Sequence, residues 1–246
     1  MNEKRKVVVF IPCYMDQLQS DTALNMVKIL QYFNCKVDLI KHAYCCGQIA
    51  YAKGYDSEAK ELGKRMSQAI NLYNDLDIVI PDAACSSYIK KEISYYKKNK
   101  KKSKKEINSI YEFSEYLLRF FKNEFNNIEW ETTVTIHDAC KGTKLKNYKK
   151  SIRSIIEMIN GVKLVEMQDA DTCCGFGGPF ALDFPELSCK IGKDKWNDAL
   201  QTDVNWLVSN DSSCLIHIDA CNNTSETSLK TIHIVDFIAK SLKIID

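Results

Sequence analysis

Short apolar runs alternate with amphipathic segments along the whole chain. Runs typical of buried strands occupy residues 7–12, 36–40 and 77–81 in the first half, and 133–137, 163–167 and 205–209 in the second. Helical periodicity appears between and after them, over 22–33, 57–72, 108–122, 149–159 and 185–200. Strands that alternate with helices predict parallel βαβ units, so the pattern predicts an α/β fold.

Two helix starts carry a local signal. Ser20 or Asp21 is predicted to cap the helix over 22–33, because short polar side chains accept hydrogen bonds from the first free amides of a helix. Pro185 is predicted to open the helix over 185–200, where its missing N–H costs nothing.

The cysteines repeat along the chain. The sequence Cys-Cys-Gly at 45–47 recurs at 173–175, which is 128 residues later. Two more pairs have nearly the same separation, 127 residues for one and 129 for the other. Eight of the 11 cysteines therefore form two quartets: Cys13, Cys45, Cys46 and Cys85, and then Cys140, Cys173, Cys174 and Cys214. The repeat predicts two pseudo-symmetric lobes, 1–129 and 130–246, each a small, mostly parallel sheet with helices.

The quartets also have a common position relative to the predicted strands. Each cysteine of a quartet follows shortly after the end of a strand. Ligand sites of open α/β sheets lie at the carboxyl ends of the strands. We therefore expect three distant segments to bring four sulfurs together at one edge of each lobe.

Composition and charge exclude several classes of protein. Hydrophobic residues make up 45% and charged residues 27%, which is ordinary for a soluble globular protein. The net charge of +2 gives no overall basic field for binding nucleic acid. No apolar run approaches the roughly 18 residues of a membrane span, and the first run ends at Pro12, too early for a secretory signal. We predict a cytoplasmic chain with reduced thiols.

Seven lysines lie between residues 97 and 105. Such a run usually forms a solvated loop. The alternative is a docking patch for an acidic redox partner.

The quartets favour iron over zinc. Structural zinc sites usually contain C-x₂₋₄-C pairs, and this chain has no CxxC. Adjacent thiolates suit a cluster of several irons, and soft thiolates select iron–sulfur chemistry. A zinc-binding or scaffold protein without a redox role stays an open alternative.

Residues outside the quartets have weaker signals. Cys35 and Cys189 have no repeat partner and are interpreted as packed thiols, whereas Cys221, seven residues after Cys214, is an alternative extra ligand. His137 precedes Cys140 by three residues and is an alternative donor to a cluster sulfur. Three glycines, Gly47, Gly175 and Gly177, are predicted to bring backbone N–H groups close to a cofactor.

Four stretches carry a family resemblance: YCCGQIAYAKGYDSEAKELGKRM, HDACKGTKL, TCCGFGGPFAL and the SCLIHI segment. They resemble the cysteine-rich (CCG) domain family, which includes the CCG-type subunit of heterodisulfide reductase. The resemblance is greatest to its short stand-alone members of the lactate-utilisation protein A and YkgE types.

The resemblance implies two pseudo-symmetric α/β lobes that bind iron–sulfur clusters, 4Fe–4S and one per lobe. It also implies an electron-transfer subunit of an L-lactate-oxidising complex, acting with a ferredoxin-like iron–sulfur subunit and a third lactate-utilisation subunit. Full CCG motifs end in CxxC, but here only Cys85 and Cys214 stand at those positions. Four thiols per lobe are enough for one cubane cluster and one short for a non-cubane cluster. The alternative function is a cluster-based thiol or disulfide reductase related to the same subunit of heterodisulfide reductase.

Overall fold

The computed structural model describes residues 4–41, 45–100, 109–143, 146–222 and 227–246. The elements of the first half are β1 (Arg5–Val9), α1 (Cys13–Leu18), α2 (Ser20–Tyr32), β2 (Cys35–Leu39), α3 (Gln48–Ala52), α4 (Asp56–Asn71), β3 (Asp77–Ile80), α5 (Ala83–Lys100), β4 (Ile110–Glu112), α6 (Phe113–Phe121) and the 3₁₀ helix η2 (Lys122–Asn127). Those of the second half are β5 (Glu129–Ile136), α7 (Cys140–Thr143), α8 (Lys146–Met158), β6 (Asn160–Leu164), α9 (Pro179–Asp183), α10 (Pro185–Leu200), β7 (Trp206–Ser209), α11 (Ser212–Cys221), β8 (Lys230–His233) and α12 (Ile234–Ser241).

The described strands form two parallel four-stranded sheets with the same topology. Their orders are β2-β1-β3-β4 and β6-β5-β7-β8, so each strand of one half has a counterpart in the other. The first strand of each half lies at the centre, flanked by the second and third. The predicted α/β fold with two similar lobes is therefore confirmed, and each of the six predicted strands is present with shifted ends.

Two sequence-based expectations are wrong in detail. The segment 108–122, predicted as one helix, contains strand β4 before α6, because Ile110–Glu112 adds to the edge of β3. Helix α2 begins at Ser20 itself, after Gln19, and no side chain caps it. Here the chain continues almost directly from α1 into α2, and the carbonyl of Gln19 accepts from Ala23 N–H. The predicted start of α10 at Pro185 is confirmed.

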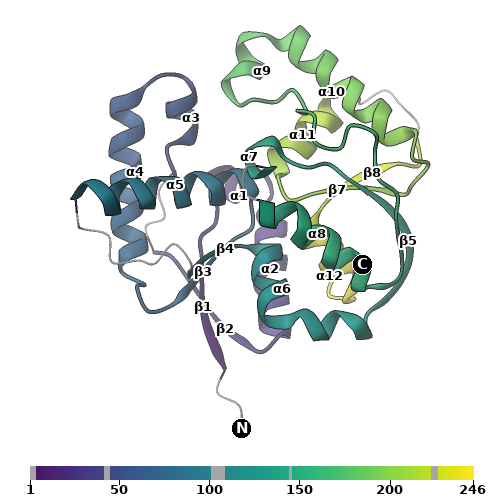
Figure 1. The fold of residues 1–246 in the computed structure, drawn as a ribbon, viewed down its shortest axis with the longest axis horizontal. Coiled ribbons are helices and arrows are strands. Elements are labelled where there is room, and N and C mark those ends of the chain that lie inside the picture. The colour runs from purple at the N-terminus through teal and green to yellow at the C-terminus, as the bar shows by residue number, and fades with distance from the viewer. Residues whose placement is uncertain (1–3, 42–44, 101–108, 144–145, 223–226) are drawn as a thin grey trace.

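The helices and sheets stack in five layers (Figure 1). Strand alternation divides the core: Val7 and Val9 of β1 face the middle layer, whereas Val8 and Phe10 face the outer layer of α4 and α5. The middle layer holds α2, α6, α8 and α12, with α2 packed on α12 and α6 on α8. Helices α10 and α11 cover the outer face of the second sheet.

The middle layer joins the two lobes. One buried cluster includes side chains of both sheets, among them Val9, Ile136 and Val208. Asp236 of α12 accepts hydrogen bonds from Thr22 (2.6 Å) and Asn25 (2.8 Å) of α2. The division of the chain into folding units 1–129 and 130–246 stays a prediction, and this shared core predicts that the two would unfold together.

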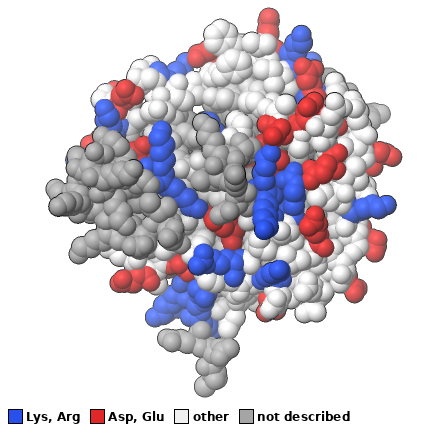
Figure 2. Space-filling view, viewed as in Figure 1, with Lys and Arg blue, Asp and Glu red and all other residues white. Residues whose placement is uncertain are grey.

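Among the described residues on the face in Figure 2, basic and acidic side chains are interspersed. In the lysine run, residues 97–100 continue α5, and residues 101–105 lie outside the described residues. Within the described part of the chain, no helix is both long enough and apolar enough to cross a membrane.

Candidate metal centre

The four cysteines of the first quartet meet at the carboxyl edge of the first sheet. Cys13 begins α1 just after β1, Cys45 and Cys46 follow β2, and Cys85 lies in the first turn of α5 after β3. The sulfurs of Cys46 and Cys85 are 3.9 Å apart. Cys45 hydrogen-bonds to Cys13 and Cys46, so the four thiols form one connected group, as the strand-end argument predicts.

The second quartet repeats this arrangement. Cys140 begins α7 after β5, Cys173 and Cys174 follow β6, and Cys214 lies in the first turn of α11 after β7. Cys173 hydrogen-bonds to Cys140 and Cys174, and Cys174 also hydrogen-bonds to Cys214. The repeat seen in the sequence is therefore a repeat of local geometry.

Two buried aspartates position the last cysteine of each quartet. Asp82 accepts a hydrogen bond from the backbone N–H of Cys85 at 2.8 Å. Asp211 accepts from the N–H groups of Ser213 at 3.1 Å and Cys214 at 3.3 Å, as an N-cap of α11. Neither aspartate was predicted from the sequence, although their separation of 129 residues equals that of Cys85 and Cys214.

Two of the three predicted glycines shape the Cys-Cys-Gly turns. Gly47 and Gly175 have φ of +92° and +90°, which L side chains rarely adopt. A Cβ at Gly47 would lie 2.9 Å from the carbonyl oxygen of Ala59, and one at Gly175 would lie 2.5 Å from that of Ser188. The turns therefore pack directly on the long helices α4 and α10.

These glycines also donate to the thiols. The N–H of Gly47 points to Cys45 Sγ at 3.5 Å, and the N–H of Gly175 points to Cys173 Sγ at 3.3 Å. Gly177 has a φ of +57°, and a Cβ there would lie 2.8 Å from that of Phe180. It lines a cavity together with all eight quartet cysteines. A role for these glycines in holding a cofactor stays a prediction.

In each quartet, one thiol has a lowered pKa and the others have raised pKa values. Hydrogen bonds from Cys13 and Cys46 lower the pKa of Cys45, and hydrogen bonds from Cys140 and Cys174 lower that of Cys173. The pKa values of the donating thiols are raised by the same hydrogen bonds and by burial. Within each quartet, the thiol with the lowered pKa is therefore the one that loses its proton most readily, and a cation at the centre would release the remaining protons.

Both quartets line a single cavity between the lobes. Its volume is about 190 Å³, and all eight quartet cysteines are among its lining residues. Apolar side chains of Leu18, Ile49 and Phe176 line it as well, together with the carboxyl groups of Asp82 and Asp211. Lys141 is the one basic residue among the described lining residues.

The donor set fits a thiolate-bound metal group. Soft sulfur donors suit iron–sulfur clusters, copper(I) and zinc. The 3.9 Å between Cys46 and Cys85 is close to the roughly 3.8 Å that two ~2.3 Å metal–sulfur bonds span at tetrahedral angles, so this one distance would also suit a single ion. Two other features favour a cluster of several metal atoms. Each quartet contains two cysteines that are adjacent in sequence, and all eight cysteines line one cavity.

The remaining cysteines lie away from the cavity. Cys35 is buried in the core shared by the two lobes. Cys189 and Cys221 lie together where α10 meets α11, with Cys221 Sγ 3.6 Å from Nε2 of His217. None of the three is among the lining residues.

His137, in contrast, lies at the second quartet. Its imidazole is completely buried, and one ring nitrogen lies within 4.8 Å of the sulfurs of Cys174 and Cys214. Burial, and then the charge of Lys195, lower the pKa of His137 to about 4, so the ring is neutral at pH 7.

Comparison with known proteins agrees with this geometry. A model of the cysteine-rich domain (CCG) matches residues 7–90 and again residues 134–219. Lactate utilization protein A 1 of Bacillus mycoides (strain KBAB4) is 30% identical over 217 residues, which cover 87% of this chain and 88% of that protein. Lactate utilization protein A of Bacillus subtilis (strain 168) is 27% identical over 237 residues, with 95% and 98% coverage.

One solved structure is similar in fold. The crystal structure of a hypothetical protein from Helicobacter pylori matches with a TM-score of 0.63 and 11% sequence identity. The match covers 100% of this chain and 50% of that chain. At this identity the likeness concerns the fold alone.

The two segments matched by the domain model contain both cysteine quartets and together span more than half of the chain. The resemblance predicted from the cysteine motifs is thus confirmed. The chain belongs to the cysteine-rich (CCG) domain family, with one copy of the domain in each half.

Proposed function

We propose that this chain is an iron–sulfur electron-transfer subunit of a system that oxidises L-lactate, with one 4Fe–4S cluster held by each cysteine quartet. The observation that carries the proposal is the pair of connected thiol quartets that line one cavity. The similarity to proteins named lactate utilization protein A supports the choice of pathway.

Each feature of the site has a role in this function. Bound by the two quartets, clusters would supply one-electron transfer. The backbone N–H groups of Gly47 and Gly175 would stabilise negative charge on the cysteine sulfurs that they contact. Three apolar side chains would limit the access of water to the cavity: Leu18, Ile49 and Phe176. The positive charge of Lys141 would stabilise the negative charge of the thiolates.

The same residues argue for a subunit that needs partners. Oxidation of a hydroxy acid requires a base for the hydroxyl proton and an acceptor for a hydride or two electrons. The cavity's carboxylates, Asp82 and Asp211, are already occupied with the backbone of α5 and α11. The sequence has no GxGxxG nucleotide motif. We therefore propose a ferredoxin-like iron–sulfur subunit and a third lactate-utilisation subunit as partners.

The test is lactate-dependent dye reduction under anaerobic conditions. The purified chain alone is expected to give no turnover above background, because the described residues of the cavity provide neither a free base nor a hydride acceptor. Addition of the proteins encoded beside its gene is expected to give robust turnover. Robust lactate oxidation by the isolated chain would contradict the proposed role.

A second function, reduction of a small disulfide, is favoured by one observation. Both quartets line the same cavity, so a substrate there would be within reach of both. Reduction of a disulfide takes two electrons and two protons and releases two thiols. The chemically reduced chain should be mixed with low-molecular-weight disulfides, and thiol release should be measured. Release of two thiols for every two electrons that the reduced chain gives up, beyond the release in a sample without protein, would favour this function over electron transfer.

A further inference from the structure

His137 follows the central strand of the second sheet and is completely buried. Neither ring nitrogen has a hydrogen-bond partner within the described part of the chain. A buried imidazole normally pairs at least one nitrogen, because leaving a polar atom unpaired away from water costs about 1–3 kcal/mol. At least one ring nitrogen is therefore expected to have a partner other than the described residues of the chain.

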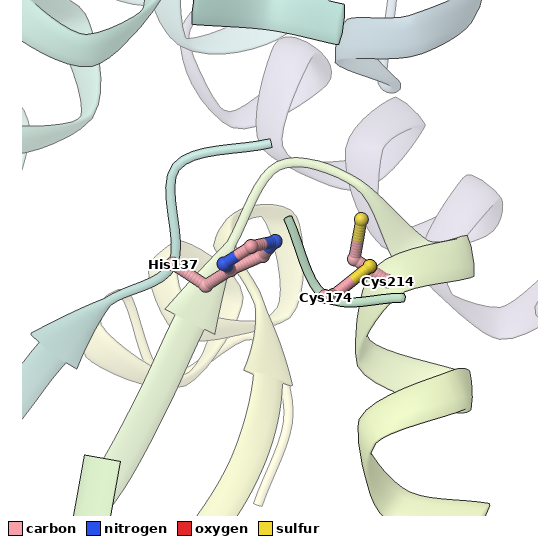
Figure 3. Close-up of side chains that lie close together, drawn as sticks. All are labelled: His137, Cys174 and Cys214. Atoms are coloured by element: carbon pink, nitrogen blue, oxygen red, sulfur yellow. The ribbon is translucent and has the colours of Figure 1, made fainter. Parts of the chain in front are cut away.

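The ring lies beside the sulfurs of the second quartet. Figure 3 shows the imidazole of His137 next to Cys174 and Cys214. One ring nitrogen and the two sulfurs are all within 4.8 Å of one another. Three soft or borderline donors in such a group are near enough to bind one metal atom.

The first lobe has a different residue at the matching position. Phe10 precedes Cys13 by three residues, as His137 precedes Cys140, and both lie at the end of a central strand. Phe10 is also buried, and it packs in one cluster with Cys46 and Cys85. A phenyl ring fills this space at no polar cost, so packing alone does not require an imidazole in the second lobe.

We infer that His137 is a nitrogen ligand of the metal centre in the second lobe. This rests on the proposed iron–sulfur function. The second lobe would then have five donors, the four thiols and one imidazole, whereas the described residues of the first lobe offer four thiols at the matching place. His137 would also supply the fifth donor that the missing CxxC cysteine leaves out. The two lobes of this pseudo-symmetric chain would therefore hold chemically different centres.

The difference has a direct consequence for electron transfer. A neutral imidazole stabilises the oxidised, more positive iron less than an anionic thiolate does, and histidine ligation raises the potential of Rieske centres. The second-lobe centre is therefore expected to be reduced before that of the first lobe. With the two centres at one cavity, electron transfer from the first-lobe centre to the second-lobe centre would be energetically favourable.

The test is pulsed electron paramagnetic resonance of the dithionite-reduced protein, prepared anaerobically with ¹⁴N- or ¹⁵N-histidine. We expect a strong nitrogen hyperfine coupling that changes with the isotope. It should disappear in His137→Phe, which copies the first lobe, and persist in the matched control His217→Gln. Among the described residues, His217 is the other histidine near a thiol, at Cys221 and away from the cavity.

A gain-of-function variant covers the case in which His137→Phe does not fold. Phe10→His should introduce a second nitrogen coupling and narrow the difference between the two reduction steps. Iron–sulfur clusters without any histidine coupling in the wild-type protein would overturn the inference and leave the proposed function intact. Zinc in place of iron would overturn the proposed function, and the inference with it.

Discussion

Serine in place of Cys174 is expected to remove the iron of the second lobe while the first lobe keeps its own. A serine hydroxyl is a hard, weakly acidic donor and replaces a soft thiolate poorly. Cys174 is buried and contacts both Cys173 and Cys214, so its loss disrupts the whole quartet. Because each lobe has its own quartet, about half of the iron should remain. Cys46→Ser should have the same effect on the first lobe.

Matched cysteines in each lobe provide the controls. Cys189 lies in the same lobe as Cys174 but away from the cavity, so Cys189→Ser is the control for Cys174→Ser. Cys35→Ser is the corresponding control for Cys46→Ser in the first lobe. Both variants should retain wild-type iron and acid-labile sulfide, measured per folded chain after anaerobic purification. Equal iron loss in Cys189→Ser and Cys174→Ser would contradict the assignment of the quartets.

Stability should fall by about 3 kcal/mol between pH 4.5 and pH 8 because of one carboxyl group, Glu112. Glu112 ends β4 and caps α6, where one oxygen accepts from the N–H groups of Ser114 (3.0 Å) and Glu115 (3.2 Å). The other oxygen has no partner within the described residues. Burial raises the pKa of Glu112 from 4.5 to about 7.

The sign follows from proton binding. The folded state holds the Glu112 proton more tightly than the unfolded state, so the neutral form contributes its full stability below pH 4.5. That contribution is lost as the pH rises to about 7, where the buried group ionises in the folded state.

Glu112→Gln keeps a cap acceptor without a charge. The stability difference between wild type and this variant should therefore change by the same amount between pH 4.5 and pH 8. Urea unfolding at both pH values measures it, and Glu58→Gln, at an exposed first-turn position of α4, is the control. Parallel pH profiles for wild type and Glu112→Gln would contradict the argument.

The repeat made much of this structure predictable from the sequence. A cysteine at the same offset in both halves marks a strand end, and the paired sheets follow from that spacing. The fourth strand of each sheet was not predicted because it runs directly into a helix: β4 ends at Glu112 where α6 begins, and β8 ends at His233 where α12 begins. In Ile110–Glu112 the apolar positions also continue smoothly into α6, so helical periodicity hides the strand.

Contacts between the lobes could not be predicted in the same way. The repeat describes each half separately, whereas the shared cavity depends on how α2 and α6 pack against α12 and α8. The residues around His137 do not by themselves indicate that it is buried, since a histidine three residues before a cysteine is compatible with solvent exposure. Comparison with Phe10 at the matching offset was the one available hint.

The central claim is that the two quartets hold iron–sulfur clusters, and Mössbauer spectroscopy of anaerobically purified, ⁵⁷Fe-enriched protein tests it most directly. Iron and acid-labile sulfide should be quantified on the same sample. The account predicts a brown protein with about eight iron atoms per chain, all in cysteine-bound clusters of the 4Fe–4S type, with or without the additional imidazole ligand in the second lobe. A colourless protein that contains stoichiometric zinc and no sulfide would contradict it.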